Sequence, residues 1–377
     1  MSTNVKKTEL RDVSLDIIRS IAIIFVVLNH SVESYFNLED FDTAVAINTW
    51  GQSGIMLLFT IGRMGVPLFL MLTGYLMLVR DYDKPGAIKK FWLHNLLSLV
   101  ITWEIWLFLY NIFLAVHNNA PFDVAGWIRQ MTFTGPLEIT HYWYMPMIIG
   151  IYVFIPFIAK GIKNVPKYAL YIMLAVCFAA LFVVPSINVF YRAFEIDLLT
   201  LNANPIFWAT YSATFMLLGH ILFLRKKKLH FLVYIIEAVA FAAGLLVSVY
   251  FQIFLHANGS QYNLWYSFFT VPPMAYCLFD LLKLIPWRRY TGFIRRISIC
   301  SFGIYLIHRP VQMTLEREDS FFTNMTSGIP AVGTMWLLLL FSFFISFGIT
   351  EGLGQIPIVG NLLVRIRKRT PSVQKIN

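Results

Sequence analysis

Ten stretches of mainly apolar residues run through this chain, and each is close to the length that a helix needs to cross a bilayer. A spanning helix takes roughly 20 mainly apolar residues. Hydrophobic residues make up 58% of the chain and charged residues only 13%, whereas an average soluble domain has about 25% charged residues. The composition excludes a soluble globular enzyme and a disordered protein, and it predicts an all-α, polytopic membrane helix bundle with about ten transmembrane helices. The stretches lie at approximately 15–36, 53–79, 91–117, 141–159, 168–185, 204–224, 229–255, 262–282, 297–316 and 330–352.

The basic residues indicate how the bundle is oriented in the membrane. The formal net charge of +10 would, in a soluble protein, raise the question of nucleic acid binding. With the N-terminus inside and ten spans, however, 24 of the 30 Lys and Arg residues fall in cytoplasmic segments, as basic residues do in membrane proteins. We therefore expect both termini in the cytoplasm and no nucleic acid partner. The remaining six are Arg19, Arg63, Arg129, Arg192, Arg309 and Arg317.

The same pattern predicts one membrane domain, surrounded by membrane lipids and flanked by short segments. We expect a cytoplasmic N-terminal segment over residues 1–14, the ten-span domain over 15–352 and a basic cytoplasmic tail over 353–377. The cysteines lie within apolar runs and have no metal-ligand spacing, so no metal site is expected. They are Cys177, Cys277 and Cys300.

The first span carries ionisable residues, which are costly inside a membrane and usually face the interior of the bundle. Arg19 and His30 are eleven residues apart, so in a helix they lie within roughly 20° of one face and about 16 Å apart along the axis. Asp16 precedes Arg19 by three residues, and Glu33 follows His30 by three. Each cation can therefore have a neighbouring carboxylate.

Two interpretations of this pattern stay open at this point. Arg19 can extend to the cytoplasmic interface while His30 caps the outer end of the helix through polar contacts. Alternatively, His30 is a buried general base with Glu33 beside it, and Arg19 binds an anionic cytosolic ligand about three turns away.

Other spans also carry polar groups at unusual positions. Arg63 lies in the middle of the second span. At the start of the third, Lys89 and Lys90 alone would be an ordinary positive flank, but His94 lies one turn deeper. Two further segments contain histidine among aromatic residues: His141-Tyr-Trp143-Tyr144-Met, for which an interfacial aromatic belt is the simpler explanation, and Gly303-Ile-Tyr-Leu-Ile-His308.

Taken in order, these residues resemble the acyltransferase-three family of integral membrane O-acyltransferases. Arg19 and His30 match its arginine–ten–histidine motif. The segment Gly65-Val-Pro-Leu-Phe-Leu-Met-Leu-Thr-Gly-Tyr-Leu76 is similar to its second-span motif, and the segments that begin at His141 and Gly303 are similar to two later motifs. Four short motifs in the right order are specific together, and the resemblance covers roughly residues 10–355.

The resemblance implies transfer of an acyl group, most often acetyl, from cytosolic acetyl-CoA or another acyl-CoA to a hydroxyl of a surface glycan or lipid-linked sugar. It implies a multi-pass protein of the bacterial cytoplasmic membrane. His30 would be the catalytic base, with Arg19, Asp16 and Glu33 as its catalytic partners. The CoA phosphates would be held by residues on the cytoplasmic side, and the acceptor by residues near the outer mouth. The candidates are Arg19, Arg63, Lys89, Lys90 and His94 for the donor, and His141, Trp143, Tyr144 and His308 for the acceptor.

Two other functions fit the sequence less well. A transporter or exporter of a glycan precursor would also carry buried charges and glycine-broken spans, but no inverted repeat is visible. A membrane sensor or scaffold would tolerate substitution of Arg19 or His30.

Overall fold

The computed structural model describes residues 12–36, 38, 49–138, 140–200, 210–225, 229–258, 263–285 and 291–366. Within these residues the regular structure is helical, as expected, and no β-strand occurs. Most of the expected N-terminal segment, residues 1–11, and part of the expected tail, residues 367–377, lie outside the described part. The first half of the chain forms α1 (Val13–Tyr35), α3 (Thr49–Gly62), α4 (Gly65–Met77), α5 (Ala87–Phe91), η1 (Trp92–Leu96), α6 (Leu97–His117), α7 (Val124–Met131), η2 (Thr140–Trp143) and α8 (Tyr144–Ile162). The second half forms α9 (Lys167–Phe178), η3 (Ala179–Val183), α10 (Val184–Ala193), α11 (Tyr211–Leu224), α12 (Phe231–Ala257), α13 (Val271–Leu284), α14 (Thr291–Leu315), α15 (Phe321–Thr326), α16 (Ala331–Gln355) and α17 (Val359–Leu363).

Seven of the ten expected spans are helices long and apolar enough to cross a membrane. The other three expected spans also coincide with helices, but α11 and α13 have 14 residues each within the described part. The third, α14, has 25 residues and includes Arg295, Arg296 and Arg309. Length and composition therefore confirm a multi-pass membrane protein with seven candidate spans. These are Val13–Tyr35, Gly51–Met77, Ala87–His117, His141–Ile162, Lys167–Ala193, Phe231–Ala257 and Ala331–Gln355.

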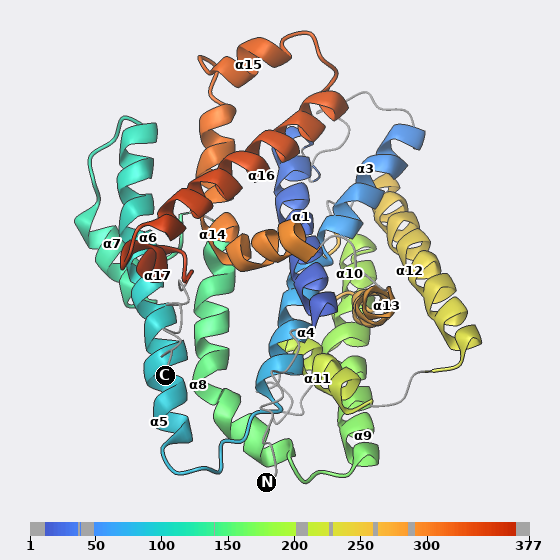
Figure 1. Ribbon diagram of the computed structural model, residues 1–377. Helices are drawn as coiled ribbons and strands as arrows, with labels where there is room; N and C mark the ends of the chain where they lie inside the picture. Colours follow the sequence, from blue (N-terminus) through green and yellow to red (C-terminus); the bar gives the residue numbers. More distant parts are fainter. Residues whose placement is uncertain are drawn as a thin grey trace.

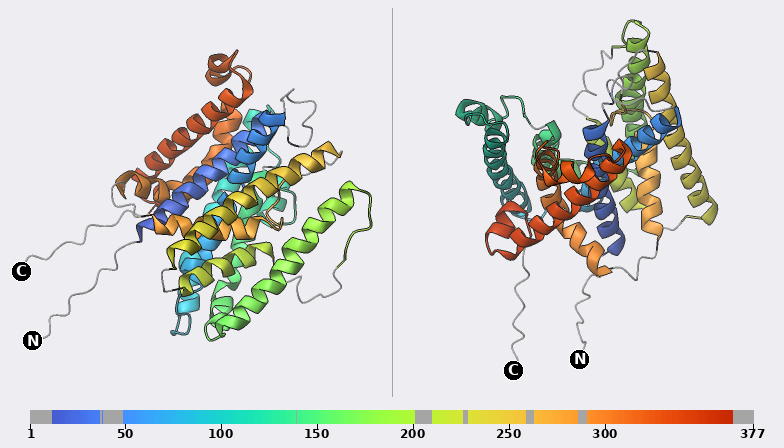
Figure 2. Two further views of the ribbon diagram at one scale, coloured as in Figure 1. Left: turned by 90° about the vertical axis from the view of Figure 1, so that its right-hand side faces the viewer. Right: turned by 90° about the horizontal axis from the view of Figure 1, so that it is seen from above.

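The first helix, α1, forms the centre of the bundle. It contacts α3, α4, α13, α14 and α16 (Figure 1). Its side chains Ile18, Ala22, Ile23 and Val27 are completely buried. By contrast α12 exposes large apolar side chains along its length, as a lipid-facing helix does. Seen from above in Figure 2, α6 and α12 lie on opposite sides of the molecule with α1 between them.

The polypeptide backbones of α4 and α11 come very close where two glycines face the opposite helix. A Cβ atom added at Gly74 would lie 1.9 Å from the carbonyl oxygen of Met216, and one added at Gly219 would lie 2.0 Å from that of Met71. Small residues allow such close packing in membranes, where dispersion contacts rather than water exclusion hold helices together. The second-span motif of the sequence is therefore, in part, a packing motif.

Replacing Gly74 with alanine is expected to destabilise the fold by at least the roughly 1–3 kcal/mol typical of overpacking, because the obstacle is backbone and cannot rotate away. Thermal unfolding in detergent measures this. Gly54→Ala in α3 and Gly150→Ala in α8 are matched controls, because each has the same gain in helix propensity and nothing within 4 Å of the added Cβ. Equal unfolding temperatures for all three variants would contradict the close approach.

The break between α3 and α4 sets the position of Arg63. Pro67 has no N–H, so it cannot donate to the carbonyl of Arg63 as an uninterrupted helix would require. The chain turns there, with the Met64 N–H donating to the Ile61 carbonyl at 3.0 Å and the Leu68 N–H to the Met64 carbonyl at 3.1 Å. Arg63 therefore lies at a helix junction beside α1 rather than on a regular lipid-facing turn.

Candidate functional site

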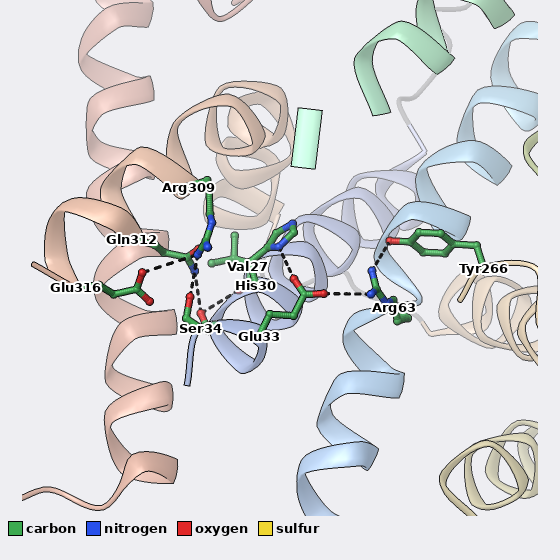
Figure 3. Close-up of polar contacts among 10 residues, drawn as sticks. Val27, His30, Glu33, Ser34, Arg63, Tyr266, Arg309, Gln312 and Glu316 are labelled. Atoms are coloured by element: carbon green, nitrogen blue, oxygen red, sulfur yellow. Dashed lines mark hydrogen bonds and ion pairs between the residues drawn. The ribbon is translucent and has the colours of Figure 1, made fainter. Parts of the chain in front are cut away.

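A chain of polar contacts joins His30 on α1 to the α3–α4 junction. Nδ1 of His30 lies 2.8 Å from Oε2 of Glu33, and Oε1 of the same carboxylate accepts from Nη2 of Arg63 at 3.1 Å (Figure 3). The three-residue spacing of His30 and Glu33 brings both side chains to one face of the helix, as predicted. A carboxylate is an acceptor, so Nδ1 of His30 carries the shared proton and Nε2 is the nitrogen able to take another.

Arg63 is held inside a ring of aromatic side chains. Its guanidinium carbon lies 4.5 Å from the ring centre of Phe59, 5.1 Å from that of Trp265 and 5.3 Å from that of Tyr266. Nη1 also donates to the Tyr266 hydroxyl at 3.4 Å. Arg63 is 8% exposed, so its charge is compensated by Glu33 and the ring faces. These contacts orient the guanidinium toward Glu33.

Three imidazole rings from distant parts of the sequence meet at this point. The ring centres of His30 and His308 lie 5.3 Å apart, those of His30 and His141 5.8 Å, and those of His141 and His308 5.1 Å. The rings come from α1, η2 and α14, so the fold brings together the histidines of three separate sequence motifs. We call His30, His141 and His308 the histidine cluster.

The hydrogen bonds of His308 fix its tautomer. Nδ1 lies 3.1 Å from the carbonyl oxygen of Ile304 and 2.8 Å from that of Tyr305, so this nitrogen must carry a proton. Its Nε2 and both ring nitrogens of His141 are buried and have no hydrogen-bond partner in the described part of the chain. Within the same part, no group of three or more His, Cys, Asp or Glu side chains is arranged to hold a metal ion.

A second polar cluster surrounds Arg19 in the first half of α1. Nη1 of Arg19 donates to the Ser298 hydroxyl at 3.1 Å and lies 3.6 Å from Oδ1 of Asp16. The same hydroxyl donates to Asp16 at 2.7 Å. Asp16 is buried, but 28% of the Arg19 side chain remains exposed. Asp16 and Ser298 therefore orient Arg19, and part of its side chain stays accessible.

A cavity of about 260 Å³ extends from Arg19 to Tyr305. Arg19 and Arg365 contribute its charged lining, and Tyr144, Tyr152 and Tyr305 its aromatic hydroxyls. The Tyr305 ring lies 5.7 Å from that of His141 and 6.2 Å from that of His308, so this wall borders the histidine cluster. The rest of the wall is mainly apolar, from Val26, Val66, Phe69, Leu72, Leu76, Met77, Leu99, Ile148, Ile299, Phe302 and Val364.

The other candidate residues lie in different places. Lys89, Lys90 and His94 are exposed on α5 and η1 and do not line the cavity, and a ring N–H of His94 donates to the Lys90 carbonyl at 3.0 Å. Trp143 packs against Trp265 and Tyr266, with ring centres 5.9 and 5.5 Å apart, on the Arg63 side of the site. Tyr144, which follows Trp143, lines the cavity, and its ring centre lies 5.7 Å from that of Tyr305.

Several residues of this region have no distinguishing signal in the sequence. Arg365 belongs to the basic tail, whose charge indicates only orientation, yet it lines the cavity and its Nη2 donates to the Asn95 carbonyl at 3.4 Å. Ser298 looked like an ordinary residue of an apolar run. Tyr305 was part of a motif, but nothing in the sequence indicated that its hydroxyl donates to the His141 carbonyl at 3.0 Å.

Beyond the histidine cluster, α14 and the outer end of α1 are joined by a polar network. Nη1 of Arg309 donates to the Ser34 hydroxyl at 2.8 Å and to Oε1 of Gln312 at 3.3 Å, and it lies 3.8 Å from Glu316 (Figure 3). Nε2 of Gln312 donates to the Ser31 hydroxyl at 3.0 Å. This network fixes the distance between α1 and α14, and so between His30 and His308.

Comparison with known proteins identifies one family. The sequence model described as an acyltransferase domain matches residues 12–351, which include every motif discussed above. No curated protein and no solved structure matches the chain.

Proposed function

Because this chain belongs to the acyltransferase-three family of membrane proteins, we propose that it moves an acyl group from a cytosolic acyl-CoA to a hydroxyl of a cell-surface glycan or lipid-linked sugar. Acyl transfer is the activity of the family; the donor, the acceptor and the residue roles are our proposal. The acyl group is acetyl in this proposal, and the membrane is the cytoplasmic membrane of a bacterium.

The proposed topology keeps ten crossings and both termini in the cytoplasm. In that arrangement α11, α13 and α14 complete the bundle as shorter or more polar spans, packed against the seven apolar ones. Arg19 then lies nearer the cytoplasmic end of α1, and His30 nearer the outer end. The strong bias of Lys and Arg toward the cytoplasmic segments supports this orientation.

The cavity is the observation that carries the proposal. Pockets that enclose whole ligands typically measure about 300–1,000 Å³, so a cavity of about 260 Å³ suits the narrow pantetheine arm and not the complete nucleotide. The nucleotide phosphates would stay at the end of the cavity that Arg19 and Arg365 line, because a guanidinium group can bind two phosphate oxygens at once. The apolar wall then leads the thioester toward Tyr305 and the histidine cluster.

The chemistry proposed for the histidine cluster begins with His30. A sugar hydroxyl is a weak nucleophile until a base takes its proton. Glu33 holds the Nδ1 proton of His30, so Nε2 faces the reaction unprotonated and removes the hydroxyl proton while the oxygen attacks the thioester carbonyl. Glu33 also stabilises the imidazolium that forms, and Arg63 holds Glu33 in position. Arg63 is thus a positioning residue in this proposal, not a ligand of the CoA phosphates. For Lys89, Lys90 and His94, phosphate binding stays a prediction from the sequence.

The donor site makes a kinetic prediction. Arg19→Gln and Arg365→Gln are each expected to raise the KM for acyl-CoA about tenfold, because losing one charge-assisted contact costs at least about 1.5 kcal/mol. Initial rates with the purified protein in nanodiscs measure this. Arg129→Gln, which removes an exposed arginine of α7, is the matched control. An unchanged KM in both cavity variants would separate this cavity from donor binding.

A further inference from the structure

The three rings of the histidine cluster differ in which nitrogens are already engaged. His30 uses Nδ1 for Glu33, and His308 uses Nδ1 for two main-chain carbonyls. When neutral, both rings therefore offer only an acceptor nitrogen to a reacting group. His141 is the one member of the cluster whose N–H is uncommitted, because neither of its ring nitrogens has a hydrogen-bond partner in the described part of the chain.

The buried, unpartnered ring of His141 does not stabilise the fold. His141 is only 4% exposed, and a buried polar group without a hydrogen bond costs about 1–3 kcal/mol. The His141 ring is surrounded by the rings of Tyr110, Tyr142 and Tyr305, at ring-centre distances of 4.6 to 5.9 Å. An apolar ring at position 141 would make the same packing contacts without an unsatisfied polar group. Buried unsatisfied groups in native proteins call for a specific reason, and a bound ligand is one.

The position of His141 relates it to the cavity. Its carbonyl oxygen accepts from the Tyr305 hydroxyl at 3.0 Å, and Tyr305 forms part of the cavity wall. The His141 ring also lies beside the His30 ring, with ring centres 5.8 Å apart. His141 is therefore next to both a residue of the cavity wall and the proposed base, and the proposed reaction places the thioester carbonyl beside it.

Several other candidate donors nearby are already engaged or are of the wrong kind. The Ser31 hydroxyl donates to the Val27 carbonyl at 2.9 Å, and the Tyr305 hydroxyl donates to His141. The unpartnered atom of Asn29 is Oδ1, which is an acceptor. Three tyrosines remain as competitors: Tyr142, whose buried hydroxyl has no hydrogen-bond partner in the described part of the chain, and Tyr144 and Tyr152, which line the cavity.

We propose that the N–H of His141 donates to the thioester carbonyl oxygen and stabilises the oxyanion that forms there. This inference rests on the proposed function. In the step itself, the sugar oxygen bonds to the carbonyl carbon and its proton moves to Nε2 of His30, which gives a tetrahedral oxyanion held by His141. The oxyanion then collapses, the carbon–sulfur bond breaks, and the proton on His30 passes to the thiolate. The products are the sugar ester and free CoA.

The test replaces His141 and measures rate and stability together. Removing one oxyanion donor typically lowers kcat about 10²–10³-fold, so we expect His141→Phe to lose this much while the KM for acyl-CoA changes less than about threefold. His141→Gln, which keeps a side-chain N–H, is expected to recover at least about tenfold of that loss. The thermal unfolding temperature of His141→Phe should equal or exceed that of the wild type, because an unsatisfied polar group has been replaced by an apolar ring.

The outcomes separate this inference from the function on which it rests. A wild-type protein that transfers no acyl group overturns both. An active wild type with an equally active His141→Phe overturns the inference alone. A loss of kcat in Tyr142→Phe, Tyr144→Phe or Tyr152→Phe that His141→Phe does not share overturns it too. A fall in the unfolding temperature of His141→Phe, without a fall in kcat, would assign the ring a packing role. His117→Phe, at the end of α6, is the matched control and should leave both quantities unchanged.

Discussion

Replacing His30 with alanine is expected to lower the rate of acyl transfer about 10²–10⁴-fold, the range that a positioned general base contributes. The fold should remain intact, because 17% of the His30 side chain is already exposed and its hydrogen-bond partner Glu33 keeps its ion pair with Arg63. The rate is measured as release of CoA thiol with the purified protein in nanodiscs, at saturating acyl-CoA.

The matched control for this experiment is His117→Ala, which removes a histidine at the end of α6 whose ring packs against Phe113, with ring centres 5.3 Å apart. Full activity in His30→Ala would remove His30 from its proposed role. A loss of activity accompanied by the same loss in His117→Ala would point to a general effect of substitution rather than to the base.

Replacing Arg63 with alanine is expected to have the largest effect on stability. It leaves the charge of Glu33 without its cation, and breaking a buried ion pair costs about 3–5 kcal/mol. We expect about 3 kcal/mol, the lower end of that range, because 33% of the Glu33 side chain is exposed. Thermal unfolding in detergent should show the loss, and transfer should slow because Glu33 no longer orients His30.

The double variant Arg63→Ala with Glu33→Gln distinguishes positioning from phosphate binding. Neutral glutamine needs no cation, so the double variant should recover much of the lost stability. Its rate should stay low, because the carboxylate that fixes the His30 tautomer is missing. An Arg63→Ala protein with wild-type stability and only a raised KM for acyl-CoA would instead make Arg63 a ligand of the donor phosphates, as the sequence first suggested.

The sequence predicts individual helices, because their position depends on local sequence, but it does not predict how they pack together. Each of the ten apolar stretches overlaps a helix, because an apolar segment in a bilayer must satisfy its backbone hydrogen bonds within itself. Apolar length could not show that α11 and α13 have only 14 residues, or that α14 already begins at Thr291 and so includes Arg295 and Arg296. Nor could it show that Gly74 and Gly219 face each other, because that depends on how α4 and α11 cross.

In the candidate site, likewise, contacts within one helix could be predicted from the sequence and contacts between helices could not. The pairs Asp16–Arg19 and His30–Glu33 follow from helical periodicity, and both are present as contacts. The ion pair between Glu33 and Arg63 depends on the helix break at Pro67, which positions Arg63 beside α1. The histidine cluster depends on the packing of α1, η2 and α14 against one another. Arg365 was hidden among basic residues whose number is explained by orientation. Long-range contacts of this kind carry no local periodicity from which to predict them.

Acyl transfer to a glycan can be measured directly as the incorporation of labelled acetyl groups. The purified protein in proteoliposomes is supplied with acetyl-labelled acetyl-CoA and a cell-envelope glycan fraction that contains lipid-linked sugars. Our account predicts label on the glycan in an ester that mild alkali releases, with one CoA thiol formed for each ester. Movement of unmodified glycan across the membrane with no ester and no free thiol would contradict it and would identify an exporter instead.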